Sequence, residues 1–309
     1  MRAFVFPGQG AQAVGMGHDL AGAYPEAKAV FDEVDEALGE KLSSLIWDGD
    51  IETLTLTENA QPALMATSMA VLRALESEGV GIGTAAFVAG HSLGEYSALC
   101  AAGALTLSDT ARLLRARGKA MQAAVPVGDG AMAAVLGLDL NAVQALVEAN
   151  AQGDCLAAAN DNDPAQVVIS GTREAVSRAV ENAKAAGAKR ALLLPVSAPF
   201  HCAMMAPAAT EMAEVIRGVE IKEPVVPVVS NVRACGVTDP SIIRDLLIEQ
   251  ITGSVRWRES VIWMAGEGVG EFWEIGAGKA LSGMVRRIVK DADVRVVETA
   301  DDIRAAVEA

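Results

Sequence analysis

Short apolar runs along the chain alternate with longer stretches in which apolar residues recur every three or four positions. Such runs are typical of buried strands and such stretches of helices, so their alternation predicts a mostly parallel α/β sheet. For the first and last thirds of the chain we expect strands at 3–6, 225–229, 271–275 and 294–297 and one ending at residue 90. The expected helices are 25–38, 57–78, 108–125, 206–217, 242–250, 256–265, 281–288 and a short one at the end of the chain.

Residues 126–195 follow a different order. The pattern predicts strands at 131–136, 155–159, 166–170 and 189–194, and helices at 140–149 and 172–186. The order βαββαβ is that of a ferredoxin-like unit, and Pro126 and Pro195 bracket it. We therefore predict a core built from 1–125 and 196–309 that carries 126–195 as an insert.

The charge of the chain limits its partners, because 40 acidic and 25 basic residues give a formal net charge of −15. Nucleic acids and anionic membranes need a basic surface, so neither is an expected partner. The four cysteines show no metal-ligand spacing, and no apolar run is long enough for a signal peptide or a membrane span. We expect a cytoplasmic monomer with reduced thiols and no metal.

A Gly-x-Ser-x-Gly motif lies at Gly90 to Gly94, between an expected strand and a helix of small residues. This spacing is typical of a nucleophile elbow, where a serine on a strained turn needs neighbours without side chains. The Leu93 N–H is then the natural first donor to an oxyanion beside Ser92. A chance match is the alternative in a chain with 29 glycines, but the position between strand and helix favours the elbow.

A serine nucleophile needs a base, and the chain has three histidines. His18 begins a polar helix and is expected at the surface, and His91, next to Ser92, is expected to point to the opposite side. His201 remains, in a loop with two prolines. No acidic third member is evident, so neutral acceptors such as Gln250 or Asn160 are left to orient its imidazole.

Gln9 lies between two glycines after the first strand. A dinucleotide site would need a second strand where the chain has a helix, so we expect Gln9 either to donate to an oxyanion or to lie in an ordinary polar loop. Arg117 falls on the apolar stripe of its helix. A buried arginine is costly unless paired, so its partner is a protein carboxylate or an anionic substrate.

Together these motifs resemble those of the malonyl-CoA:acyl carrier protein transacylases nearly from end to end. The matching stretches are Phe-Pro-Gly-Gln-Gly-Ala-Gln at 6–12, Gly-His-Ser-Leu-Gly-Glu-Tyr-Ser-Ala-Leu at 90–99, Arg-Gly-Lys-Ala-Met-Gln at 117–122, Ala-Pro-Phe-His-Cys at 198–202 and Glu-Ile-Gly-Ala-Gly-Lys at 274–279. The resemblance implies an α/β-hydrolase-like core with a ferredoxin-like insert. It also implies ping-pong transfer of a malonyl group from malonyl-CoA to acyl carrier protein in fatty acid synthesis, without a cofactor.

The resemblance also implies a role for each matching residue. It gives the nucleophile as Ser92, the base as His201, the malonyl carboxylate clamp as Arg117, the oxyanion hole as the Gln9 side chain and the Leu93 N–H, and the histidine-orienting group as the Gln250 carbonyl. Phe200, beside His201, is expected to crowd a 2-methyl branch on the acyl group.

Three alternatives remain beside this expectation. A serine thioesterase or carboxylesterase could use the same elbow, although it would gain nothing from a buried Arg117. A scaffold with a vestigial site is another alternative, and the same transfer in a polyketide pathway is a third. For docking of the acidic carrier we expect one of two basic clusters, Lys189 with Arg190 or Arg286 with Arg287 and Lys290, unless these are ordinary solvated faces.

Overall fold

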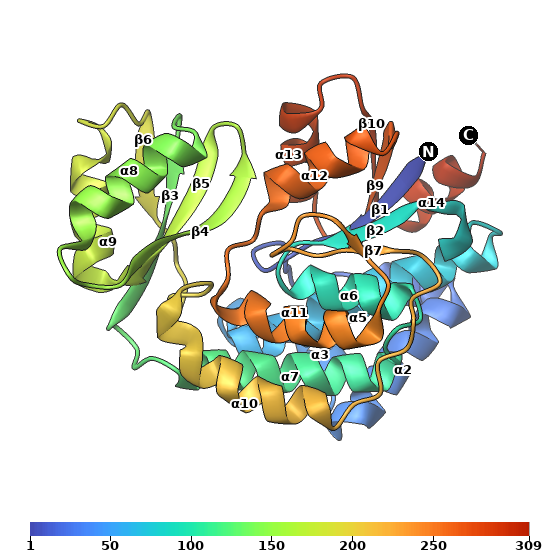
Figure 1. Cartoon of the computed structure of the whole chain (residues 1–309). Helices are drawn as coiled ribbons and strands as arrows, with labels where there is room; N and C mark the ends of the chain where they lie inside the picture. The colour runs from blue at the N-terminus through green and yellow to red at the C-terminus, as the bar shows by residue number, and fades with distance from the viewer. Residues whose placement is uncertain (309) are drawn as a thin grey trace.

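The computed structural model describes residues 1–308, and two sheets organise this part of the chain (Figure 1). The first has six strands in the order β10-β9-β1-β2-β7-β8, and the second has four in the order β4-β5-β3-β6. The first sheet is parallel except for β8, which pairs antiparallel with β7. Its strands are β1 Arg2–Phe6, β2 Phe87–Gly90, β7 Val228–Val229, β8 Gly236–Val237, β9 Glu271–Ile275 and β10 Asp293–Val297. The mixed α/β fold with a mostly parallel sheet is the one that the sequence predicts.

The strand predicted at 225–229 is wrong in length, because only Val228 and Val229 pair with β2. Pro227 has no N–H to donate to a ladder, and the N–H of Val225 donates instead to the carbonyl of Ala102. The other predicted strands of this sheet agree with the structure to within one residue at the ends given.

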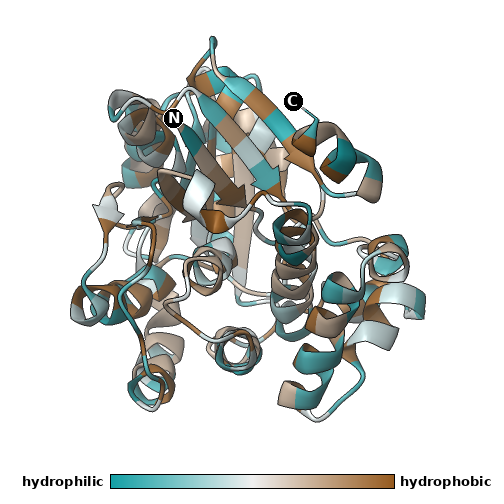
Figure 2. Cartoon of the chain, turned by 90° about the vertical axis from the view of Figure 1, so that its right-hand side faces the viewer, coloured by the Kyte–Doolittle hydropathy of each residue, from teal (hydrophilic) through white to brown (hydrophobic). Residues whose placement is uncertain are grey.

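Helices cover both faces of the first sheet (Figure 2). Side chains of β1 alternate, so that Ala3 and Val5 pack toward one face while Phe4 and Phe6 pack toward the other. The first face is covered by α12 (Trp257–Gly266) and α13 (Ala280–Ile288), and the second by α5 (Thr57–Ser77) and α6 (Leu93–Ala101). Because both faces are covered, the strands read as nearly continuous apolar runs.

The helix α5 is confirmed in position but is buried on all sides over most of its length, because α2, α6 and α7 pack around it. Polar residues on this helix, Thr57 and Gln61 among them, are therefore interior. The other helices of this unit are α1 His18–Ala23, α2 Pro25–Leu38, α3 Leu42–Asp48, α4 Ile51–Thr55, α7 Leu107–Ala123, α10 Ala206–Arg217, α11 Pro240–Thr252 and α14 Ala300–Val307. Of the helices within 1–308, none has the length and apolar character that a membrane crossing needs.

The insert lies beside this unit, at the left of Figure 1, and has the predicted element order βαββαβ. Its elements are β3 Gly130–Leu136, α8 Leu140–Ala151, β4 Leu156–Asp163, β5 Gln166–Thr172, α9 Arg173–Ala183 and β6 Arg190–Leu193. All pairings are antiparallel, and α8 and α9 share one apolar core with the sheet.

The strand β4 is longer than predicted, because the polar residues 160–163 continue the ladder with β5. Two buried carboxylates on this extension bind arginines of the large unit: Asp161 lies 2.8 Å from Arg258 Nη2, and Asp163 lies 2.7 Å from Arg287 Nε. The alternate residues, Asn160 and Asn162, line a cavity between insert and core. One face of β4 therefore anchors the insert while the other forms a wall.

Candidate active site

The predicted strand-turn-helix around Ser92 is present: β2 ends at Gly90 and α6 begins at Leu93. Ser92 has φ 54° and ψ −110°, a strained conformation for a residue with a side chain. A Cβ atom on Gly90 would lie 1.9 Å from the carbonyl of Gly94, and one on Gly94 would lie 2.3 Å from the carbonyl oxygen of Phe6. Neither glycine can be replaced without moving backbone, which explains the motif.

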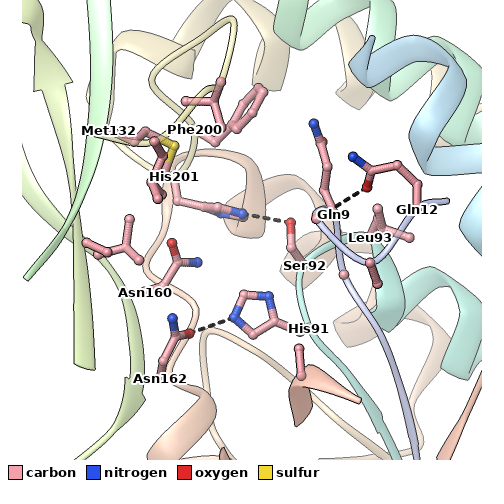
Figure 3. A pocket seen from close by; sticks show the side chains of 18 of the residues that line it. Gln9, Gln12, His91, Ser92, Leu93, Met132, Asn160, Asn162, Phe200 and His201 are labelled. Carbon is pink, nitrogen blue, oxygen red and sulfur yellow. Dashed lines mark hydrogen bonds between the residues drawn. The ribbon is translucent and has the colours of Figure 1, made fainter. Parts of the chain in front are cut away.

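The structure brings His201 to Ser92, with 2.8 Å between Nε2 and Oγ (Figure 3). The other ring nitrogen, Nδ1, lies 2.9 Å from the carbonyl oxygen of Gln250 and 3.1 Å from that of Gly253. Because a carbonyl can only accept, Nδ1 carries the proton and Nε2 is left to accept one from the serine hydroxyl. Two carbonyls thus occupy the position where a carboxylate stands in other serine triads.

The imidazole is held in its neutral form by its surroundings. Burial lowers the pKa of His201 to about 3, and the nearby positive charge of Arg117 contributes in the same direction. A neutral imidazole is the form that can accept the serine proton, so His201 has the protonation state that a general base needs at neutral pH.

Arg117 lies directly beside the serine although only 1% of it is exposed. Its Nη1 donates to Gln61 Oε1 at 2.7 Å, and its Nη2 donates to Gln250 Oε1 at 2.8 Å and to Ser92 Oγ at 3.1 Å. No carboxylate of residues 1–308 forms a salt bridge with it, and its Nε is buried without a partner. Of the two partners left open by the sequence, the protein carboxylate is absent from this part of the chain.

Gln9 lies on the other side of the serine and is oriented through the buried helix α5. Thr57 Oγ1 donates to Gln9 Oε1 at 2.7 Å and accepts from Gln61 Nε2 at 3.1 Å. With its oxygen engaged, the amide of Gln9 keeps its Nε2 as a donor without a partner among the described residues. Leu93 begins α6, so its N–H has no acceptor in a preceding turn.

A buried hydrogen-bond network that the sequence did not reveal holds the backbone of the elbow. The amide of Asn231 accepts from Ser92 N at 2.7 Å and donates to the Gly90 carbonyl at 2.6 Å. Glu95 Oε2 accepts from Gln250 Nε2 at 2.6 Å and from Asn231 N at 3.1 Å. Glu95 could have been suspected, because a glutamate in the first turn of an otherwise apolar helix needs buried partners.

The expectation that His91 faces away from the serine is wrong, because its ring lines the same cavity. Strand alternation ends with β2 at Gly90, so the rule used for His91 does not apply in the turn. Its Nε2 lies 2.8 Å from Asn162 Oδ1, which ties the elbow to the insert (Figure 3). His18 is exposed, as predicted.

The cavity holding Ser92 has a volume of about 590 Å³ and is lined from both units. The core contributes Gln9, Arg117 and Phe200, and the insert contributes Met132 (Figure 3). Within residues 1–308 no group of three or more His, Cys, Asp or Glu side chains is placed to hold a metal.

The two predicted docking clusters differ in how free their charges are. Lys189 and Arg190 are exposed where β6 begins. Arg287 is engaged by the buried Asp163, and Arg286 donates to the carbonyl of Val294 at 2.8 Å. The second cluster is therefore partly structural, which its sequence pattern does not reveal.

Comparison with known proteins places this geometry in a family. A family model described as an acyl transferase domain matches residues 3–304. The malonyl CoA-acyl carrier protein transacylase of Bacillus subtilis is 49% identical over 99% of this chain and 96% of its own length. The chain belongs to the malonyl CoA-acyl carrier protein transacylase family. It is an acyltransferase, as the resemblance implied.

Other members of the transacylase family agree along the whole length. The Escherichia coli (strain K12) protein is 46% identical over 99% of this chain and 98% of its own. The solved acyl-carrier-protein-S-malonyltransferase of Bartonella henselae is 54% identical, with a TM-score of 0.97 over 99% of this chain and 98% of its own. A malonyl-transacylase solved in complex with a type II PKS acyl-carrier protein is 44% identical, with a TM-score of 0.96 over 99% of both chains.

Proposed function

We propose that this transacylase moves a malonyl group from malonyl-CoA to the phosphopantetheine thiol of acyl carrier protein, supplying fatty acid synthesis. The observation that carries the proposal is Arg117, a buried cation 3.1 Å from Ser92 Oγ with neutral partners only. A carboxylate on the acyl group would supply the direct salt-bridge partner that Arg117 lacks among the described residues. The names of the relatives agree with this substrate.

In the first half-reaction His201 Nε2 takes the proton of Ser92 as Oγ attacks the thioester carbonyl. Negative charge develops on the carbonyl oxygen, and in this proposal the Gln9 amide and the Leu93 N–H donate to it. The tetrahedral intermediate collapses when the carbon–sulfur bond breaks, and CoA leaves with the proton from His201. Ser92 then carries the malonyl group as an ester.

The second half-reaction repeats these steps with the carrier thiol as nucleophile. His201 removes the proton of the thiol, the thiolate attacks the ester, and the proton returns to Ser92 Oγ as the ester breaks. Malonyl-CoA enters the reaction as a substrate. Neither step uses a cofactor, so we expect no cofactor to be bound. Gln250 contributes through its carbonyl, which fixes the tautomer of His201.

Several finer features belong to the same proposal. The parallel sheet with its serine elbow supports an α/β-hydrolase-like core over 1–125 and 196–309, and the order β4-β5-β3-β6 supports a ferredoxin-like insert over 126–195. We also propose that the protein is a cytoplasmic monomer. Phe200, which lines the cavity, is the residue that we expect to exclude a branched acyl group.

A second candidate is the same transfer in a polyketide pathway. It is favoured by the similarity to the malonyl-transacylase solved with a type II PKS carrier. Both candidates share the chemistry at Ser92, and they differ only in which carrier accepts the malonyl group. Rates with the two purified carriers separate them.

Intact-protein mass spectrometry after incubation with malonyl-CoA tests the central step. We expect one malonyl adduct that maps to Ser92 and disappears when acyl carrier protein is added. Ser92→Ala should form no adduct, and His201→Ala should form it about 10³-fold more slowly or worse. An adduct on another residue, or hydrolysis of the adduct faster than its transfer to the carrier, would contradict the proposal.

A further inference from the structure

Glu95 is a buried carboxyl group that the reaction described above does not use. It is 3% exposed and sits in the first turn of α6, three residues after Ser92. One of its oxygens, Oε2, accepts from Gln250 Nε2 at 2.6 Å and from Asn231 N at 3.1 Å. The carboxyl group is therefore fixed within the network that holds the nucleophile.

Gln250 connects Glu95 to Arg117 through the two ends of one amide. Its Nε2 donates to Glu95, and its Oε1 accepts from Arg117 Nη2 at 2.8 Å. The two charged groups are thus one side chain apart, without a direct salt bridge between them. A change of charge at Arg117 acts on Glu95 across a short buried path.

The other groups around Glu95 are neutral. From α11 and the loop after β7 it meets Gln250, Asn231 and Ser230, and from α7 the charged group that acts on it is Arg117. Tyr96, its neighbour on α6, stays protonated because burial raises the pKa of its hydroxyl to about 12. His201 is neutral, as described above. With Glu95 ionised, the buried cluster holds one positive and one negative charge.

A malonyl carboxylate bound to Arg117 would add a second negative charge to this cluster. A net charge in a dry interior is costly, and two carboxylates that share one cation cannot both stay ionised cheaply. The malonyl carboxylate bonds directly to the guanidinium, whereas Glu95 is held only through amides. Glu95 is therefore the group that becomes neutral at lower cost.

We propose that Glu95 takes up a proton from solvent when the malonyl carboxylate binds Arg117, and returns it when the malonyl group leaves. The proton forms an O–H bond on Oε1, so that Oε2 still accepts from Gln250 and Asn231. This inference rests on the proposed function. It adds a reason for a carboxyl group at position 95: its charge compensates Arg117 while the site is empty.

The acidity of Glu95 in the free enzyme supports this assignment. Burial raises the pKa of Glu95 to about 7, against the lowering effects of its hydrogen bonds and of Arg117. Below this pH the free enzyme already carries the proton and none is taken up on binding. Above it the free enzyme has lost the proton, so uptake grows as pH rises through 7 and malonyl-CoA binding weakens in step.

Calorimetry of malonyl-CoA binding to Ser92→Ala, in two buffers with different ionisation enthalpies, counts the protons. At about pH 8 we expect roughly 0.5 to 1 proton taken up per malonyl-CoA, and none for CoA, which has the same phosphates but no carboxylate. Adding Glu95→Gln should remove the uptake and make binding independent of pH between about 6 and 8, because the amide keeps an acceptor for Gln250 and Asn231. Glu274→Gln, at another buried carboxyl with a raised pKa, should leave the count unchanged.

Uptake that persists in Glu95→Gln would overturn the assignment, and so would equal counts for malonyl-CoA and CoA. The second comparison needs no variant of Glu95, so equal counts would overturn the assignment even if Glu95→Gln does not fold. Failure of Ser92→Ala to bind malonyl-CoA would overturn the proposed function together with this inference. Binding with no proton uptake at about pH 8 would overturn this inference alone.

Discussion

Buried charge is treated in two different ways in this molecule. At the junction between insert and core, Arg258 and Arg287 each meet a carboxylate that is only 1% exposed. Beside the nucleophile, Arg117 is more deeply buried than either, yet it bonds only to amide oxygens and a hydroxyl. An arginine that pairs with a carboxylate of the chain holds two parts of the chain together, whereas one without such a partner is available to a ligand.

The partial exposure of Arg258 and Arg287 explains why the ion pairs at the junction have a reduced desolvation cost. The Arg258 side chain is 26% exposed and that of Arg287 is 51% exposed, so each keeps part of its hydration while it pairs. Arg117 has no such contact with water. Burial of Arg117 without a direct salt bridge costs stability that Glu95, one side chain away, offsets only in part, and we infer that substrate binding is the reason for its position.

Of the changes that follow, removal of Arg117, the arginine without a carboxylate partner, should have the largest effect on activity. Arg117→Ala is expected to lower malonyl transfer by a factor of about 10² or more, because a desolvated charge-assisted pair is lost. Acetyl transfer should be spared or improved, since an acetyl group has no carboxylate to bind. Rates of Ser92 acylation by the two thioesters measure the selectivity, and equal losses would make Arg117 a structural residue.

The comparison also predicts a difference in stability. Arg117→Met, which keeps much of the side-chain volume, should leave the free energy of unfolding unchanged or raise it, because a buried cation without a directly bonded carboxylate is removed and Glu95 can become neutral by taking up a proton. Asp161→Asn should lower it by about 2 kcal/mol, because Arg258 loses its partner. Urea unfolding of both variants tests the pair of outcomes, and the reverse order would contradict the distinction.

These two regions also show what could be predicted from the sequence. Ser92 was predictable because the elbow motif is local, and Arg117 because a cation interrupts an apolar stripe. The residue that binds the Ser92 N–H was not, since Asn231 lies 139 residues away from the serine. The polar stretch 160–163 carries no strand signal, and it is a strand because β5 and the arginines of the core hold it. Tertiary contacts decided what local pattern could not.

A smaller effect is expected at Thr57, which hydrogen-bonds both to Gln9, the proposed oxyanion donor, and to Gln61, the partner of Arg117. Thr57→Val removes the hydroxyl that holds Gln9 Oε1, so the maximal rate of transfer should fall about tenfold, while Thr57→Ser should restore it. In a Gln9→Ala background, adding Thr57→Val should cost little more, because its effect passes through Gln9. Losses that multiply in the double variant would show that Thr57 acts in another way.

The smallest effect is expected at the surface. Lys189→Glu with Arg190→Glu should raise the KM for acyl carrier protein several-fold at low salt and less at high salt, because exposed charges mainly steer association. Loading of Ser92 by malonyl-CoA should not change. A matched reversal at Lys290 tests the second cluster without breaking the Arg287–Asp163 pair. Unchanged carrier kinetics in both variants would remove both clusters as docking sites.

The cavity between insert and core has a consequence for the direction in which the malonyl group is transferred. Under the proposed reaction the same space of about 590 Å³ admits the pantetheine arm of CoA and that of the carrier, so the two compete for the loaded serine. One thioester is exchanged for another, with no bond-energy difference to drive the exchange. The ratio of malonyl-CoA to free CoA therefore sets how much of the carrier is malonylated, and the enzyme catalyses the transfer in either direction.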